Sequence, residues 1–546
     1  MKSHPQYQMI TRVLPEVKDY LDGISPDLYP AGNRYGKGFV TLNSEENNFR
    51  PSMLKLVEMA KVTKKQYVSC AEGGPSIVRS TPLDDPCGAT MANVEARQFI
   101  LLKTVPNFRH WLYYKPFVSL KGSYDWSMWE KENPRQVVSA YAATARIMAF
   151  AEFVKELKLH QDIPCWMFRK DGKYFAAIWY NGKENLKVKL PDNILAEAKD
   201  VQGNPIELKD SILYLGEAPV YLYAKNPAAL EKLLADASAG VSELEFVLDR
   251  QQAGKTLLAI KNKSGHKIDL TLKSAEIPET KTIPYSDKIE LVSGEIKTVE
   301  KLVGADSVTF HLETGKGRKY AASAVLKPVK VPFVNSFAEL EKKAVPQRLD
   351  DPSKQITGYD DLKTHGVYTG LDDLSGSFRL GYDKQYLYLE ARVKDNVHLN
   401  NCSPGFLYMG DSIQFAIDTN RDAKMKLFRG VRGYSDDDFN FVSGLVKGKP
   451  YTWCFVAPTK KSAELRDKQY RLNPEITRDE KTKTTLYRIK LAFSDLAPLK
   501  PEKGRNFGFS LIIFDKDTST SFYSMEYSAG VSHPFEPSKY PAFQFE

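Results

Sequence analysis

The chain has 546 residues, of which 42% are hydrophobic and 27% are charged. These proportions are those of a soluble globular protein, and at roughly 100–200 residues per domain the length predicts three or four domains. The net charge of +9 comes from 77 basic and 68 acidic residues spread along the whole chain. Because no basic run or basic helix gathers this charge, we expect no nucleic-acid or membrane-surface binding. No stretch reaches about 18 apolar residues, which excludes a membrane-spanning helix.

The five cysteines are scattered and have neither CxxC nor Cys/His spacing, so we expect no zinc site. Free buried thiols are the first expectation, and a Cys70–Cys87 disulfide is the alternative. The first six residues are polar, and no apolar signal-peptide segment follows them. This leaves open a cytoplasmic protein or a chain whose true start is missing.

Residues 1–160 alternate between strand-like and helix-like segments. Three short apolar runs predict strands, at residues 24–30, 67–71 and 108–114. Three segments with helical apolar spacing predict helices, at 50–61, at 93–104 and from Asn133 and Pro134 to about 154. The order βαβαβα predicts a parallel sheet with helical crossovers. Three such units do not close a barrel, so we expect a partial barrel whose other strands are missing.

From residue 161 the pattern changes to strands only. Residues 161–226 contain five apolar runs with the hairpin signals Asp171-Gly172 and Asn181-Gly182, which predict a small antiparallel β domain. An alanine-rich connector follows. Residues 240–331 alternate again and predict an immunoglobulin-like β-sandwich that acts as a spacer. Residues 340–546 form the last domain. The predicted fold class is therefore multidomain, a partial α/β barrel of the TIM type followed by three all-β sandwich domains.

The stretch 376–418 has the clearest pattern in the chain. Its odd-numbered residues from Leu387 to Val393 are apolar and alternate with polar or aromatic residues, as in a strand with one buried face. In the run 412–418 the odd-numbered residues are again apolar, while Gln414 and its even-numbered neighbours point the other way. A sandwich that buries one face of this sheet leaves the opposite face free, and a flat ligand could be held there.

One carboxylate stands out in the first domain. Glu72 follows the apolar run 67–71 and precedes Gly73-Gly74-Pro75, so it would project from the C-terminal edge of a parallel sheet. Barrel enzymes carry their catalytic groups at that edge. The alternative is an ordinary loop carboxylate at a turn.

The order of segments over residues 15–225 resembles the last part of a (β/α)8 glycoside hydrolase, by architecture rather than by a distinctive motif. This resemblance implies that Glu72 is the nucleophile of a retaining enzyme, at the end of strand seven. It also implies aromatic residues close to the sugar, namely Tyr29, Trp111, Tyr113 and Tyr114. Trp126 and Trp129 lie beyond them, where stacking on a sugar and ordinary packing are both open.

Retaining hydrolysis needs a second carboxyl group about 5–5.5 Å from the nucleophile. In such barrels the acid/base follows an asparagine at the end of strand four, which has no counterpart here. Glu45 and Glu46 are the substitutes that the sequence offers. We therefore expect a hydrolase of O-glycosyl bonds only if the barrel is completed, and a non-catalytic polysaccharide-binding protein with an inactive hydrolase remnant is the alternative.

The last domain carries several short motifs in order, at residues 381–389, 393–397 and 410–418. Together they closely resemble the family 9 carbohydrate-binding modules over most of 345–546. The resemblance implies that two aromatic rings clamp a terminal sugar. One is Tyr408, three residues before Asp411-Ser412, and the other is Phe535, before the run 537–540. Gln414 matches a position where a carboxylate can bind sugar hydroxyls, and the resemblance implies that its amide takes this role.

This sequence departs from that family in two ways. The family often has tryptophan at both clamp positions, and it has a basic residue just beyond an acidic turn, where this chain has Asp436-Asp437-Asp438 followed by Phe439. For Tyr408 and Phe535 ordinary edge packing is the alternative to a clamp.

The three aspartates at 436–438 are interpreted as a solvated loop, with a structural calcium site as the alternative because their oxygens suit that ion. His398 and His533 are expected on the surface, not as metal ligands. We expect no other cofactor, and the expected partner is a polysaccharide or oligosaccharide. An intact member of such a family would be extracellular or periplasmic.

Overall fold

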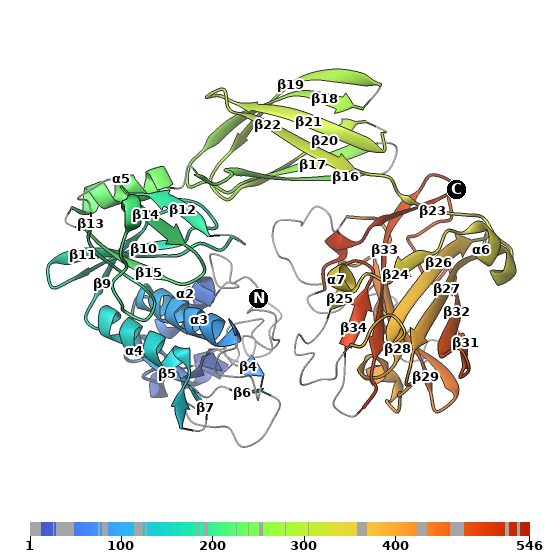
Figure 1. Cartoon of the computed structure of the whole chain (residues 1–546), viewed down its shortest axis with the longest axis horizontal. Helices are drawn as coiled ribbons and strands as arrows, with labels where there is room; N and C mark the ends of the chain where they lie inside the picture. Colours follow the sequence, from blue (N-terminus) through green and yellow to red (C-terminus); the bar gives the residue numbers. More distant parts are fainter. Residues whose placement is uncertain are drawn as a thin grey trace. The chain divides into compact units, whose positions relative to one another are not determined.

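The computed structural model describes residues 13–25, 27–28, 49–74, 77–78, 86–113, 124–125, 128–130, 132–182, 185–190, 195–224, 226–237, 240–250, 255–278, 280–303, 305–357, 368–422, 434–458, 474–518, 523–531 and 535–546. The chain divides into two compact units, one of residues 1–243 with 263–266 and the other of residues 244–262 with 267–546. Figure 1 shows both, coloured along the sequence. Among the helices of the described ranges, none is both long and apolar enough to cross a membrane.

The first unit begins with a parallel sheet built around β3. Its strands are β1 (Gly23–Ile24), β2 (Asp27–Leu28), β3 (Tyr67–Gly73) and β5 (Phe108–Tyr113), and each of the others pairs with β3 in parallel. The helices between and after them are α2 (Phe49–Ala60), α3 (Pro86–Lys103) and α4 (Gln136–Met148). The predicted βαβαβα order is confirmed. No pairing among the described strands closes this sheet into a barrel, so the barrel stays a prediction.

Three of the predicted helix boundaries are wrong. α3 begins at Pro86 rather than Asn93, since proline at a helix start needs no hydrogen-bonded N–H. Asn133 and Pro134 form the short strand β8, which pairs with β7 (Trp129–Glu130), and the helix starts only after the extended Arg135. α4 ends at Met148, and the segment expected to continue it is the strand β9 (Glu152–Glu156).

The rest of the first unit consists mainly of antiparallel β-strands. A five-stranded sheet in the order β13-β15-β11-β10-β9 contains β10 (Cys165–Lys170), β11 (Lys173–Ile178), β13 (Leu195–Lys199) and β15 (Val220–Ala224). β12 (Leu186–Lys189) pairs with β14 (Ile212–Leu215). Asp171 and Gly172, both with positive φ, make the predicted hairpin turn between β10 and β11. Trp166, Phe168 and Trp179 pack into one core with residues of the helices, so sheet and helices fold together.

The second unit starts with two antiparallel sheets. One contains β16 (Leu244–Arg250), β17 (Lys255–Asn262) and β20 (Ile296–Leu302). The other contains β18 (Ile268–Ile277), β19 (Lys281–Leu291), β21 (Ser307–Thr314) and β22 (Lys319–Val325). Leu258, Ile260, Leu270 and Phe310 are buried in one cluster. The strands-only pattern predicted here is confirmed, and the alanine-rich connector before it contains the helix α5 (Pro227–Ala237).

The last part of the chain is a β-sandwich of two sheets. The larger sheet runs β23-β35-β33-β28-β29-β30, with β34 (Tyr523–Glu526) beside β33 and β25 (Ile356–Thr357) beside β34. Its other strands are β23 (Val329–Val331), β28 (Ser412–Asp418), β29 (Asp438–Val446), β30 (Lys449–Val456), β33 (Asn506–Asp515) and β35 (Ala542–Phe545). The smaller sheet runs β24-β26-β27-β32-β31, with β24 (Gln347–Leu349), β26 (Leu374–Tyr382), β27 (Tyr386–Asp395), β31 (Glu475–Asp479) and β32 (Thr484–Ala492).

The core of this sandwich confirms the alternation read from the sequence. The odd-numbered residues from Leu387 to Val393 in β27 and from Ile413 to Ile417 in β28 all lie in the cluster between the sheets. Phe415 stacks on Phe441, with ring centroids 5.3 Å apart. The mostly β, multidomain character of the chain is therefore as predicted. The face of the larger sheet that points away from this core is called the outer face below.

The described cysteines carry free thiols. Cys70, Cys165 and Cys454 are buried and Cys402 is half-buried. Since Cys70 is free, the alternative of a Cys70–Cys87 disulfide is wrong.

Candidate functional site

The outer face is built from residues that pair side by side across four strands. Gln414 of β28 pairs with Ile512 on one side and with Val442 on the other, and Val442 pairs with Trp453 of β30. Paired residues of antiparallel strands share a face of the sheet. Ile512, Gln414, Val442 and Trp453 therefore form one row across the outer face.

Tyr408 lies over this face on a short 3-10 helix, η5 (Pro404–Met409), which contacts β28, β29 and β30. The end of η5 is tied to the sheet, because the Ser412 hydroxyl donates to the carbonyls of Leu407 (3.0 Å) and Gly410 (2.9 Å). The Asn400 amide donates to the carbonyls of Leu407 (3.1 Å) and Asp411 (2.9 Å). The half-buried Tyr408 ring meets the edge of Phe455, 5.6 Å away between centroids. The ring is thus held in one place.

Phe535 reaches the same face through Tyr434. The two rings lie 5.4 Å apart at an interplanar angle of 36°. Tyr434 and Tyr408 both pack against one small cluster of Ala416, Ile512, Phe514, Val531 and Tyr540. The two predicted clamp residues are therefore gathered on the outer face, Tyr408 directly and Phe535 by way of Tyr434.

A buried chain of hydrogen bonds runs beneath these rings. The Gln414 amide donates to Asn440 Oδ1 (2.8 Å), and the Asn440 amide donates to the Tyr434 hydroxyl and to the Val531 carbonyl. The Tyr434 hydroxyl lies 3.5 Å from that of Tyr540. Burial raises the pKa of Tyr434, so its hydroxyl stays protonated and able to donate. Gln414 is thus connected to the ring that supports Phe535.

The outer face is less open than the sequence indicated. Gln414 is only 5% exposed, and Ala416 and Ile512 are covered by Val531 and Tyr540. The expectation of a free face is wrong for its centre, because the chain near the C-terminus folds over it. Direct contact of Gln414 with a sugar stays a prediction. The sequence did not single out Tyr434 or Asn440, although Asn440 shares the alternation that places Gln414 on this face.

A group of carboxylates closes one end of the sandwich core. Oxygens of Asp373, Asp515 and Asp517 lie within 4.8 Å of one another. Burial raises the pKa of Asp515 to about 9 and that of Asp517 to about 6, and neighbouring aspartates add to both shifts. The hydroxyl of the core residue Tyr523 donates to Asp373 (2.6 Å). Such an all-oxygen group has the donor chemistry that Ca²⁺ takes.

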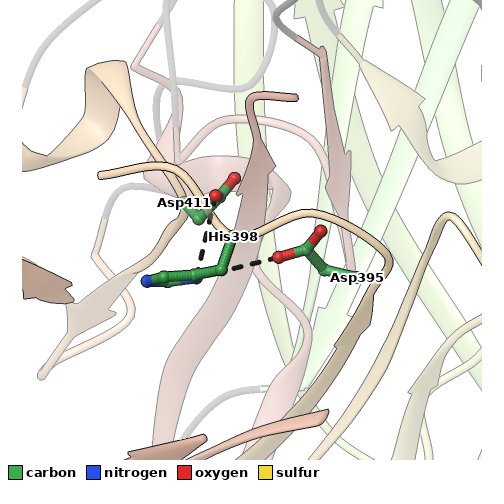
Figure 2. A group of neighbouring side chains, drawn as sticks. All are labelled: Asp395, His398 and Asp411. Carbon is green, nitrogen blue, oxygen red and sulfur yellow. Dashed lines mark ion pairs between the residues drawn. The ribbon is translucent and has the colours of Figure 1, made fainter. Parts of the chain in front are cut away.

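A second group contains a histidine (Figure 2). His398 Nδ1 lies 3.7 Å from a carboxylate oxygen of both Asp395 and Asp411, and its Nε2 lies 3.0 Å from the Leu445 carbonyl. Burial is the largest influence and lowers the pKa of His398, but the nearby Asp395 carboxylate, the hydrogen bond to the Leu445 carbonyl and the charge of Asp411 raise it above its ordinary value. Burial, and then the Asp395 charge, raise the pKa of Asp411 to about 8.

The position of His398 corrects a prediction. Its side chain is 13% exposed, so it is not a surface residue, because the turn after β27 folds it between the two carboxylates. His533 lies outside the described residues.

The aspartates at 436–438 also differ from the solvated loop that was expected. Asp436 is exposed, but Asp437 and Asp438 are buried, since Asp438 already pairs with Asp418 at the end of β28. Burial raises the pKa of Asp418 to about 7 and that of Asp438 to about 8. Asp437 forms a third group with Asp418 and Asp422, and this group too could hold a cation.

In the first unit, Glu72 is the penultimate residue of the central strand β3. Its backbone stands opposite Asp27 of β2, and the next residue, Gly73, stands opposite Leu28 and Tyr113. The predicted position at the C-terminal end of a parallel strand is thus observed. For Glu72, Trp111 and Tyr113 the structure describes the backbone and not the side chain. The described residues do not include Tyr29, Glu45, Glu46, Tyr114 and Trp126. Their predicted roles stay predictions.

Comparison with known protein families finds one match. Residues 354–535 match the family model described as "Carbohydrate family 9 binding domain-like". The match covers Tyr408, Gln414 and Phe535, and residues 354–535 are therefore a domain similar to the family 9 carbohydrate-binding modules. A search of curated protein sequences finds no match to this chain.

Among solved structures, the chain is similar to a family 9 carbohydrate-binding module from Caldicellulosiruptor kristjanssonii in complex with cellotriose (16% identity, 40% of this chain, 94% of that chain, TM-score 0.27). The chain is also similar to a putative carbohydrate-binding protein from Bacteroides uniformis (13% identity, 40% of this chain, 99% of that chain, TM-score 0.27). A third similar structure is an Anoxybacillus α-amylase (13% identity, 34% of this chain, 43% of that chain, TM-score 0.22). Likeness of this degree does not by itself establish a common fold.

Proposed function

We propose that the sandwich at the end of the chain binds carbohydrate, holding a terminal sugar between Tyr408 and Phe535. The observation that supports this most is that Tyr408 packs on one small apolar cluster of the outer face, and that Phe535 lies against Tyr434, which packs on the same cluster. It lies within the residues that match the carbohydrate-binding family model. The expected partner is an oligosaccharide or the end of a polysaccharide.

The chemistry of such a site follows from its two kinds of group. A flat aromatic ring presents apolar area to the C–H groups of a sugar, and a ring that is already fixed loses little entropy on binding. Tyr408 is fixed by the hydrogen bonds at both sides of η5, and Phe535 is supported by Tyr434. Gln414 and Asn440 lie beneath the rings and hold Tyr434 in position, so they support the clamp through their mutual hydrogen bond.

The test is retention on a glycan array of the full chain and of Tyr408→Ala and Phe535→Ala. Each variant should bind about tenfold more weakly, the change that 1.4 kcal/mol of lost binding free energy gives. Tyr386→Ala is the matched control, because Tyr386 is a half-buried ring on the smaller sheet, next to Lys490. Unchanged retention in both clamp variants would reject the proposal.

A second proposal concerns the first unit, as part of a retaining glycoside hydrolase with Glu72 as nucleophile. It is supported by the place of Glu72 at the C-terminal end of a central parallel strand. Glu72 would attack the anomeric carbon, and an acid/base outside the described residues would protonate the leaving oxygen. Turnover of aryl glycosides that disappears in Glu72→Gln is the expected result. A chain that binds glycans but turns over no glycoside would instead be a non-catalytic binding protein.

A further inference from the structure

We infer that the edge strand β30 carries a second sugar-binding surface, an aromatic row of Tyr451, Trp453 and Phe455 that takes the following units of a glycan chain. The inference rests on the proposed clamp. The clamp would hold the terminal sugar of a glycan, and the aromatic row would hold the sugar units that follow it. Its substrate class is an oligosaccharide or polysaccharide of at least three or four sugar units, as opposed to a single terminal sugar.

The strand pairing places this row on the same face as the clamp. Trp453 pairs with Val442, which pairs with Gln414, and Tyr451 pairs with Gly444, which pairs with Ser412. Between these residues Thr452 and Cys454 are buried, and Cys454 points into the sandwich core. With strands about 4.8 Å apart, Trp453 stands two strands, or about 10 Å, from Gln414.

The row is also continuous with the clamp through η5. Tyr408 contacts Phe455, and the Phe406 ring lies 6.4 Å from that of Tyr408. A Cβ placed on Gly405 would stand 3.9 Å from the Trp453 ring, so the backbone of η5 runs beside that ring. Phe406 and Met409 are 54% and 46% exposed. A patch of apolar side chains therefore extends from Tyr408 to the edge of the sheet.

The shape of this patch favours a glycan over a protein partner. The three rings of the row are half-buried, and Tyr451 and Trp453 stand at alternate positions about 6.8 Å apart along one strand, while Phe455 lies at a shift in the pairing of β30 with β29. A stable protein interface buries roughly 800 Å² on each partner, far more than a single strand with one short helix presents. A narrow line of aromatic rings beside a sugar clamp suits an extended chain of sugar rings, each with its own apolar face.

The experiment compares short and long ligands on a glycan array that carries the disaccharide and the hexasaccharide of each sugar. The full chain should retain the hexasaccharide about tenfold more strongly than the disaccharide, which corresponds to about 1.4 kcal/mol. Trp453→Ala should lose this preference and keep disaccharide retention within about twofold. Tyr408→Ala, by contrast, should weaken both. Thr452→Val, on the same strand with its side chain turned inward, should keep the preference and is the matched control.

Two further measurements separate this inference from misfolding and from failure of the clamp. Trp453→Phe keeps an aromatic ring, so it should fold and retain part of the preference. Trp453 is the only tryptophan after residue 179. Its fluorescence is obtained by subtracting the emission of Trp453→Phe from that of the full chain. The hexasaccharide should change this fluorescence, and the disaccharide should not. If Trp453→Ala kept the preference for the hexasaccharide, the second sugar-binding surface would be rejected and the clamp would not. The same conclusion would follow if the full chain formed a dimer in solution that Trp453→Ala made monomeric. No retention of any glycan by the full chain would reject both.

Discussion

The two faces of the larger sheet of the C-terminal sandwich use the same strands for opposite purposes. The inner face of β28 offers Ile413, Phe415 and Ile417, which are wholly buried between the sheets. The outer face of the same strand offers Gln414 and Ala416, which lie beneath half-buried aromatic rings and a chain of hydrogen bonds. The inner face forms the core of the fold, and the outer face carries the side chains of the proposed sugar site.

The difference shows how polar and aromatic groups can be placed rigidly without belonging to the main core. Each outer-face group is fixed by one or two specific contacts, such as the Gln414–Asn440 hydrogen bond, whereas the inner-face groups are fixed by close packing on all sides. We therefore expect substitutions on the inner face to lower stability most, and substitutions on the exposed part of the outer face to change binding with little change in stability.

The largest expected effect is that of Phe415→Ala. Removing this ring leaves a cavity next to Phe441, so the free energy of unfolding of the C-terminal sandwich should fall by about 3–5 kcal/mol. Denaturant unfolding followed by circular dichroism measures the change. Phe415→Leu, which keeps more of the volume, should lose less. Equal losses in both variants would contradict the packing argument.

Asn440→Ala should come next. It leaves the Gln414 amide and the Val531 carbonyl without a bond that they make in the folded state, which costs about 1–3 kcal/mol. Because Tyr434 also loses one of its hydrogen-bond partners, glycan retention should weaken together with stability. Asn440→Asp keeps the acceptor for Gln414, so it separates the two bonds. Full stability in Asn440→Ala would show that the chain of hydrogen bonds contributes little.

The carboxylates at the end of the inner face predict an effect of pH that is smaller per pH unit than the effect of either substitution. The folded pKa of Asp515 is raised to about 9, above the unfolded value near 3.8, so from about pH 4 to pH 9 the folded state binds more protons than the unfolded state. The free energy of unfolding should therefore fall as the pH rises through this window, by on the order of 1 kcal/mol per pH unit at most.

Unfolding midpoints at pH 5 and pH 8, in EDTA and in Ca²⁺, measure this effect. Asp515→Asn cannot ionise, so its midpoint should change less with pH in EDTA. Ca²⁺ should raise the midpoint of the unmodified chain at pH 8 more than at pH 5, because the ion offsets the charges of Asp373, Asp515 and Asp517. An unfolding midpoint that changed neither with pH nor with Ca²⁺ would contradict this prediction.

The smallest expected effect on stability is that of Phe406→Ala. This ring is 54% exposed, so its removal should change the free energy of unfolding by less than about 0.5 kcal/mol. The same variant should weaken hexasaccharide retention, since the Phe406 ring lies beside Tyr408 and its neighbour Gly405 lies beside Trp453. If Phe406→Ala lost as much stability as Phe415→Ala, the expected difference between the two faces would be wrong.

The sequence predicts the inner face well, because period-two alternation is a local signal that burial of one sheet face enforces. It also predicts Tyr408 and Phe535 as outer-face residues, since short motifs of a known family fix their positions. It does not reveal Tyr434 as the support of Phe535, because the partners of Tyr434, at Val531 and Tyr540, lie about a hundred residues further along the chain.

His398 and α4 show the same limit at shorter range. The residues that bury His398 are close in sequence, but only the turn after β27 and the fold of η5 bring both carboxylates to it. Asn133 and Pro134 have the composition of a helix start, yet pairing with Trp129 and Glu130 draws them into a strand. For Glu72 the strand position was predictable, whereas its chemistry depends on groups that lie elsewhere in space.

The edge strand β30 contains a cysteine whose chemical labelling can measure local opening of the strand. Cys454, a buried free thiol whose sulfur faces the Val456 carbonyl at 3.3 Å, stands between Trp453 and Phe455. A thiol reagent can reach it only when the strand opens away from the sheet, so the labelling rate measures the free energy of that local opening. A glycan bound along the proposed row would stabilise the closed strand and slow the labelling by the same factor as it lowers the population of the open state. Binding at this surface can thus be followed as protection of a single sulfur atom on its opposite side.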